Sequence, residues 1–142
     1  MSLKNLLNEG KIESVEKAEF SCDSSLKDIS SAKNSLNSKD YDWAIAISYT
    51  AILKVVRSFM QSKGFRPIGK EHHKNAFEFV RDSGFNLQLV DYFDKIRKYR
   101  NSFMYGITEG NTEKNAKETI LNAERFVLEI RTFVLKNRTG ER

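Results

Sequence analysis

The sequence has little of what interrupts a helix. It contains one proline and seven glycines in 142 residues, whereas an all-β domain needs turn residues at each strand connection. The glycine patterns that cradle a phosphate or surround a nucleophilic serine do not occur. Cys22 is the sole cysteine, which excludes an internal disulfide and a cysteine-based zinc site and fits a reducing compartment. These absences favour a helical protein without a disulfide framework.

Long uncharged apolar runs are absent too. The N-terminal stretch MSLKNLLNEGKIESVEKAEF has no apolar segment typical of a signal peptide. The most apolar stretch, residues 43–60, contains Lys54 and Arg57, which a membrane span tolerates badly. With 39% hydrophobic and 30% charged residues, we expect a soluble, cytoplasmic protein that does not enter a membrane. The net charge of +5 permits an anionic partner.

Apolar residues recur at intervals of three and four along most of the chain, and this spacing predicts helices. Short helices are expected over residues 3–9 and 71–82, and long ones over 23–36, 41–60, 87–105 and 113–134. The helix over 41–60 has the widest apolar stripe, so it should be the central one. No segment shows the two-residue period of a strand, and none is expected.

The expected fold is therefore an all-α, up-and-down helical bundle of four long helices plus short extra helices. We expect a single domain over residues 1–142, with its core at about 12–136 and a frayed tail at 137–142. Asp23 or Ser24, Asp40 and Asn86 are the expected N-caps.

His72 and His73 form the first candidate site. Neighbouring residues on a helix point about 100° apart, so the pair cannot easily hold one metal ion, and capping or packing is the plainer role. Asp40 and Asp42 are typical of the acidic first turn that the helix dipole favours. No acidic cluster has the spacing of a magnesium site. We therefore expect neither a metal nor a cofactor.

The segment RKYRNSFMYG, residues 97–106, differs from these. Arg97, Asn101 and Tyr105 are four residues apart and share one helix face, and Arg100 lies beside them. Upstream, the same side of the helix carries apolar residues, so polar groups continue a stripe that begins as core. A buried arginine needs an anion, a carbonyl or a partner chain. A cationic cluster favoured by the helix dipole would account for the arginines, but not for the asparagine and the tyrosine.

Three stretches resemble one known family, the HEPN superfamily of small prokaryotic helical bundles. SLNSKDYDWAIAISYTAILKVVRSFMQSKGFRP is similar to its helix of alanine, tyrosine and aliphatic residues, and GFRPIGKEHHKNAFEFV to its glycine–histidine entry to the third helix. IRKYRNSFMYG resembles the segment of the nuclease motif, an arginine followed four to six residues later by a histidine. The resemblance covers about residues 12–134.

The resemblance assigns positions in that motif. Arg100 matches the motif arginine, Asn101 matches the polar residue after it, and Tyr105 stands where the histidine belongs. In nuclease members, the arginine and histidine of two protomers converge across a dimer interface, position the phosphate and assist attack by the ribose 2′-hydroxyl. A tyrosine, whose ordinary pKa is about 10, exchanges protons poorly at neutral pH.

The resemblance implies a homodimeric domain of a toxin–antitoxin or defence type system. It would bind RNA or a nucleotide in a cleft, with absent or weak ribonuclease activity. The expected binding residues are Arg97, Arg100, Asn101 and Tyr105, of which Arg100 and Tyr105 form a degenerate catalytic pair. The dimer interface should include Arg97, Arg100 and Tyr105.

Two alternatives stay open. The chain could be a pure protein-interaction domain that pairs with a minimal nucleotidyltransferase. It could also be an active metal-independent endoribonuclease in which Tyr105, or a histidine of the 72–73 pair, replaces the missing base.

Overall fold

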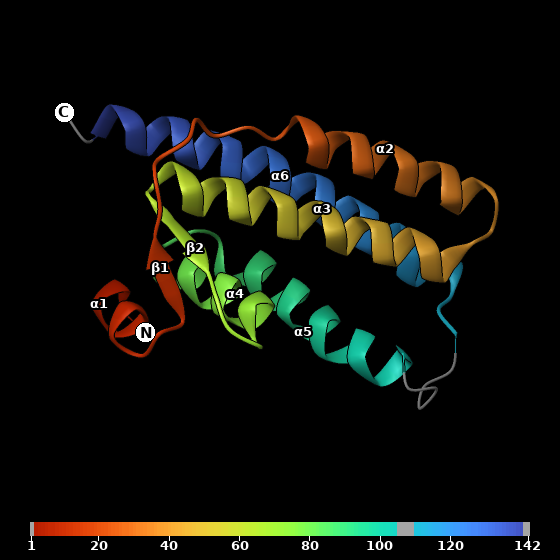
Figure 1. The fold of residues 1–142 in the computed structure, drawn as a ribbon. Helices are drawn as coiled ribbons and strands as arrows, with labels where there is room; N and C mark the ends of the chain where they lie inside the picture. Colours follow the sequence, from red (N-terminus) through yellow and green to blue (C-terminus); the bar gives the residue numbers. More distant parts are fainter. Residues whose placement is uncertain (1, 105–109, 141–142) are drawn as a thin grey trace.

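A computed structural model describes the backbone of residues 2–104 and 110–140, and the side chains of all of these except residues 100–104 and 138–140. The described elements, in chain order, are α1 (Leu3–Asn8), β1 (Ile12–Ser14), α2 (Asp23–Asn37), α3 (Tyr41–Ser62), β2 (Phe65–Pro67), α4 (His72–Asp82), α5 (Leu87–Met104) and α6 (Glu113–Gly140). The four long helices α2, α3, α5 and α6 form the expected all-α bundle (Figure 1).

The central helix is α3, as its wide apolar stripe predicts. It contacts α2, α4, α5 and α6, with α2 and α6 on one side and α4 and α5 on the other (Figure 1). Its inward residues, among them Ile52 and Val56, are fully buried. Within the described part of the chain, α3 is the one helix long and apolar enough to span a membrane, but 56% of its most apolar window is buried inside the bundle. That burial is typical of a core helix.

The expectation that no strand forms was wrong. β1 and β2 pair in antiparallel register, with Ile12 opposite Pro67 and Ser14 opposite Phe65. Glu13 faces Arg66 and forms an ion pair with it. Each strand has only three residues, too few to show a two-residue period in the sequence.

Most helix ends lie where the sequence places them. Asn86 Oδ1 accepts the backbone N–H groups of Gln88 and Leu89 and so caps α5. Asp40 is the N-cap residue of α3, although its side chain makes no capping hydrogen bond. The expectation for α2 was wrong by one residue, because Asp23 lies inside the helix and Cys22 precedes it. At the other end of the chain, α6 continues to Gly140, and its last four residues belong to the segment expected to fray.

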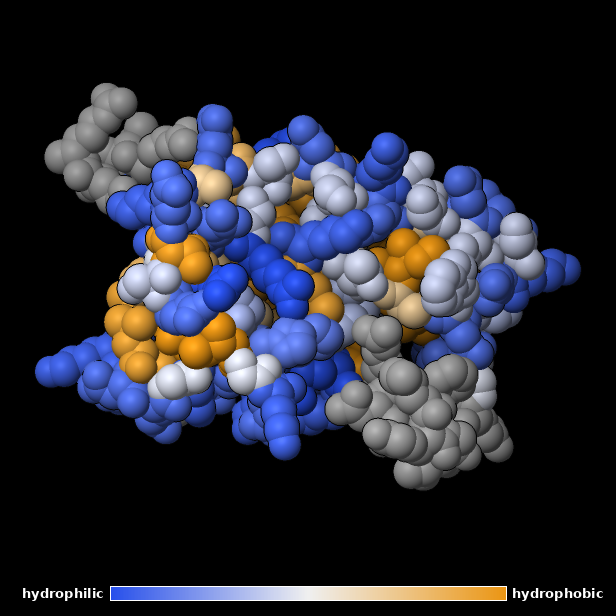
Figure 2. All heavy atoms as spheres, in the orientation of Figure 1, coloured by the Kyte–Doolittle hydropathy of each residue, from blue (hydrophilic) through white to orange (hydrophobic). Residues whose placement is uncertain are grey.

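The core is rich in aromatic rings near the ends of α3, α4 and α6. Phe59 lies 5.9 Å from Phe79 and 6.0 Å from Phe133 between ring centroids, and Phe85 lies 5.0 Å from Phe126. The face in Figure 2 is mostly hydrophilic, and apolar side chains gather over α1, where Leu3 and Leu7 are each 38% exposed.

Candidate functional site

The helix that carries the candidate residues, α5, changes character along its length. In its first half Leu89, Val90 and Phe93 are buried and face α3 and α4. In its second half the apolar stripe gives way to arginine and asparagine. The helix thus begins as part of the core and carries the arginines of the candidate site in its second half.

The structure places the four predicted residues as follows. Arg97, Arg100 and Asn101 lie on α5, so the backbone carries them on one continuous helix. The side chains of Arg100 and Asn101, and the whole of Tyr105, lie outside the described residues. Arg97 is the one of the four whose contacts are described.

Arg97 is held by the protein itself. Its Nε donates a hydrogen bond of 2.8 Å to Asp94 Oδ1, and both side chains are 16% exposed. Asp94 also lies 3.4 Å from Arg81 of α4, which pairs with Asp91 at 2.7 Å. Two arginines and two aspartates therefore form a charge-balanced cluster that ties α4 to α5.

The cluster stabilises the positive charge of Arg81. Burial alone would lower the pKa of Arg81, but its hydrogen bond to Asp91 and the negative charges of Asp91 and Asp94 outweigh burial and raise that pKa. The cluster therefore works as a structural clamp between α4 and α5.

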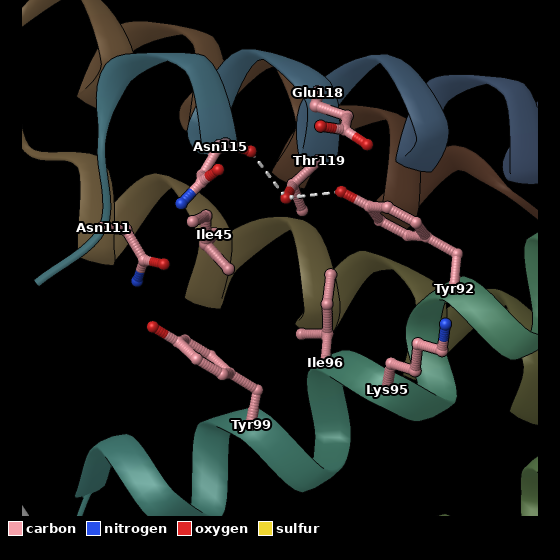
Figure 3. Close-up of a pocket in the computed structure, with 9 residues that line it drawn as sticks. All are labelled: Ile45, Tyr92, Lys95, Ile96, Tyr99, Asn111, Asn115, Glu118 and Thr119. Carbon is pink, nitrogen blue, oxygen red and sulfur yellow. Dashed lines mark hydrogen bonds between the residues drawn. The ribbon is translucent and has the colours of Figure 1, made fainter. Parts of the chain in front are cut away.

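A cleft opens beside the middle of α5, between α5, α3 and the start of α6 (Figure 3). Its volume is about 350 Å³. The walls combine two phenols, two isoleucines, two amides, a hydroxyl and two opposite charges, supplied by Tyr92, Tyr99, Ile45, Ile96, Asn111, Asn115, Thr119, Lys95 and Glu118. Such a lining suits a flat, partly apolar ligand with polar edges.

One wall of the cleft is fixed by hydrogen bonds. The Thr119 hydroxyl donates to the Asn115 carbonyl at 2.8 Å, and it lies 3.0 Å from the Tyr92 hydroxyl. Because the threonine has only one hydroxyl proton, Tyr92 is the donor to Thr119. Figure 3 shows both hydrogen bonds, and it shows the Tyr99 phenol directed across the cleft. Tyr99 is 41% exposed, so its ring is accessible to a ligand.

The start of α6 is anchored to α3 through Asp42. Asp42 Oδ1 accepts two hydrogen bonds from Asn111, one from the backbone N–H and one from the side-chain amide, each of 2.9 Å. These bonds fix the segment that closes the cleft at the end nearest Tyr99. The acidic first turn of α3 therefore has a tertiary role that its sequence context did not reveal.

The two histidines begin α4. His72 Nδ1 lies 3.1 Å from the Gly69 carbonyl, and the two imidazole rings are 4.3 Å apart, edge to face. His73 also packs against Tyr49 of α3, with 6.1 Å between ring centroids. These contacts match the packing role predicted for the pair. Within the described residues, no three His, Cys, Asp or Glu side chains are placed to hold a metal ion.

Sequence reasoning missed this cleft, because none of its lining residues is among the four predicted site residues. Tyr92, Lys95, Ile96 and Tyr99 follow the i, i+3, i+4, i+7 spacing of one helix face, so that wall could have been found from the sequence. The facing residues on α6, such as Thr119, could not, because only the tertiary packing brings them opposite α5.

Fold and site together define a small all-α bundle with a partly apolar cleft beside an arginine-bearing helix. The family model of the HEPN domain matches residues 18–132, which lie within the stretch that resembles this family. The chain belongs to the HEPN domain family. No curated protein and no solved structure shows significant similarity to it.

Proposed function

We propose that this chain is the HEPN domain of a prokaryotic, cytoplasmic toxin–antitoxin or defence system. It binds RNA or a nucleotide as a homodimer, in the cleft beside the middle of α5, and it cleaves RNA weakly or not at all. The ligand's phosphate binds at Arg100, and its base binds beside the cleft tyrosines.

One observation carries this proposal. The helix with the motif arginine is also the helix that supplies Tyr92 and Tyr99 to an open cleft. Arginine donates two parallel hydrogen bonds to a phosphate, and an exposed aromatic ring stacks on a base. One helix can therefore supply both a group that binds the phosphate and a ring that stacks on the base of a nucleotide. Family membership supports the dimer, since HEPN domains commonly dimerise.

The first test measures affinity for a mixed single-stranded RNA pool at several salt concentrations. Arg100→Ala should weaken binding about tenfold or more, because hydrogen bonds to charged groups contribute about 1.5–3 kcal/mol. The salt slope should fall by about 0.7 for each phosphate that the variant no longer neutralises. Arg57→Ala is the matched control, since it removes the same charge from an exposed site on α3. Equal weakening in both variants would show that only net charge matters.

The second test measures cleavage of the same pool. Wild type should cut weakly or not at all, and Tyr105→His should raise cleavage because it introduces a group that titrates near neutrality. Adding Arg100→Ala to Tyr105→His should remove the increase. Efficient cutting by wild type would make the protein an active ribonuclease and contradict the proposal.

The Arg97–Asp94 ion pair favours a second candidate, a protein-interaction domain for a minimal nucleotidyltransferase. An arginine already held by an aspartate is a weaker clamp for an added phosphate, but it stiffens the surface that a partner protein would contact. In that case no variant binds RNA, and Arg100→Ala disrupts the complex with the partner instead.

A further inference from the structure

A row of exposed leucines runs along the outer side of α6. Leu121, Leu128 and Leu135 are 63%, 39% and 55% exposed. They are spaced by seven residues, close to two helical turns, so they lie above one another over about 21 Å. The core residues of α6, such as Ala123 and Val127, are buried on another side of the helix. Exposed apolar side chains gathered in this way mark surfaces of protein association.

Charges of both signs flank this leucine row. Glu124 and Arg131 lie on the same flank, one before Leu128 and one after it. If a second α6 lies antiparallel and centred on Leu128, the partner's Arg131 comes within about one residue, roughly 1.5 Å along the axis, of Glu124. Two-fold symmetry repeats the pair. Glu124 also binds Lys33 at 2.7 Å, and its carboxylate can accept a second donor.

The other flank is complementary in the same register. Glu118 comes within about two residues, roughly 3 Å along the axis, of the partner's Lys136. A partner helix of one charge sign would meet like charge somewhere along these flanks, because each flank carries both signs. A second copy of α6 places Glu124 beside Arg131 and Glu118 near Lys136, and each pair occurs twice by symmetry. Lys117 then comes within about one residue of the partner's Arg138 on the first flank. The attractive pairs outnumber this like-charge pair two to one, which favours this chain as the occupant of the row.

A groove beside the row offers space for the partner's side chain. Its volume is about 420 Å³, and it lies between α6 and the α4–α5 turn, lined by Phe85, Leu128, Thr132 and Phe133 among others. In the antiparallel register, the partner's Leu121 lies level with Leu135, at the mouth of this groove. The most exposed leucine of each protomer therefore packs against an apolar surface.

We propose that α6 is a self-association surface, in which two copies pair antiparallel through Leu121, Leu128 and Leu135. Three leucines on one helix cover less surface than a standard interface, which buries about 800 Å² per partner. We therefore expect a dissociation constant on the order of micromolar. This surface shares only Glu118 with the cleft, and it does not depend on the proposed function. If the cleft also forms a dimer, the two interfaces together give assemblies larger than a dimer.

Sedimentation velocity over a concentration series tests the surface. Leu128→Ser should weaken one association step at least tenfold, and its RNA binding should match wild type. Leu87→Ser is the control, because Leu87 is 54% exposed on α5 and outside the row. Arg100→Ala should leave the α6 step intact, so failure of the cleft proposal is separable from failure of this one. Equal association of wild type and Leu128→Ser would overturn the proposal.

Charge reversal tests the register. Glu124→Arg should weaken association, because it places two arginines together across the two-fold axis. Adding Arg131→Glu should restore it, because the ion pair then forms with the signs exchanged. Failure of the double variant to recover would contradict the antiparallel arrangement.

Cysteine cross-linking gives an independent readout of which residues meet across the interface. Cys22 stays in place, because it is buried at 7% exposure. Leu128→Cys should cross-link to itself under mild oxidation, and Leu121→Cys should cross-link to Leu135→Cys when the two proteins are mixed. Leu121→Cys alone should stay monomeric on a denaturing gel, as should Leu87→Cys. Self-linking of Leu121→Cys, or no link at position 128, would refute the arrangement.

Discussion

The two ends of the bundle are built from the same helices but from different side chains. At one end, which we call the aromatic end, Phe59, Phe79, Phe85, Phe126 and Phe133 pack ring against ring. At the other, the polar end, α5 and α6 enclose the cleft of Figure 3.

α6 shows the contrast within one element. It carries Phe126 and Phe133 into the aromatic end, and Asn115 and Thr119 into the polar end. The aromatic end uses apolar burial, which contributes about 25 cal/mol per Å² to stability. The polar end uses satisfied hydrogen bonds, whose net contribution is smaller. If the cleft binds the proposed ligand, stability and binding are separated along the bundle axis, and substitutions at the two ends should have different effects.

The largest effect should come from the aromatic end. Phe126 is fully buried and lies 5.0 Å from Phe85 and 5.7 Å from Phe93 between ring centroids. Phe126→Ala should lower the free energy of unfolding by about 3–5 kcal/mol, because it leaves a cavity in a packed cluster. Urea denaturation followed by circular dichroism measures the decrease. Leu87→Ala, at an exposed site, should change stability by less than about 0.5 kcal/mol.

A smaller effect is expected where α3 anchors α6. Asp42→Ala removes the acceptor of both hydrogen bonds from Asn111 and should cost about 1–3 kcal/mol. Hydrogen exchange should speed up in the first turn of α6 and not around Phe126. Asp42→Asn keeps an acceptor oxygen and should destabilise the protein less. Uniform acceleration along all of α6 would show that the two ends are not energetically separable.

The cleft wall should respond more weakly still. Thr119→Val keeps the shape of a side chain that is 2% exposed but removes the acceptor of the Tyr92 hydroxyl, which should cost about 1 kcal/mol. A double-mutant cycle with Tyr92→Phe should give a coupling energy of about 0.5–1 kcal/mol. Zero coupling would mean that this hydrogen bond does not organise the cleft.

The smallest effect belongs to the surface between the ends. Lys33 and Glu124 pair at 2.7 Å with side chains 51% and 38% exposed. Lys33→Ala should change the free energy of unfolding by less than about 0.5 kcal/mol, because water and salt screen such pairs. Thermal unfolding at low and high salt checks this expectation. A decrease in the free energy of unfolding above about 1 kcal/mol would show that the Lys33–Glu124 pair stabilises the protein more than an exposed ion pair should.

The sequence predicts the aromatic end better than the polar end. Apolar spacing is a local signal, and it predicts the long helices and the central position of α3. The Asn86 cap is also a local signal, because it depends on the residue type at the start of the helix. The β1–β2 pair could not be predicted, because its strands have three residues each and meet only through tertiary contact. Cysteine at an N-cap is unusual, so the true start of α2 gave no sequence signal.

The candidate site follows the same division. The row of Arg97, Arg100, Asn101 and Tyr105 was visible because it is local to one segment. Sequence spacing could not show that Asp94 holds Arg97, because an aspartate three residues before an arginine is common on exposed helices. The α6 wall of the cleft depends on Asp42 and Asn111, which are 69 residues apart in the sequence.

The most direct test of this account is to map where RNA touches the protein. RNA substituted with 4-thiouridine is cross-linked to wild type by near-ultraviolet light, and the attached peptides are identified by mass spectrometry. The account predicts attachment to the part of α5 that contains Tyr92 and Tyr99 and to the segment from Asn111 to Thr119. At a protein concentration below saturation, both signals should fall about tenfold in Arg100→Ala. Cross-links concentrated at the aromatic end, near Phe85 and Phe133, would contradict it.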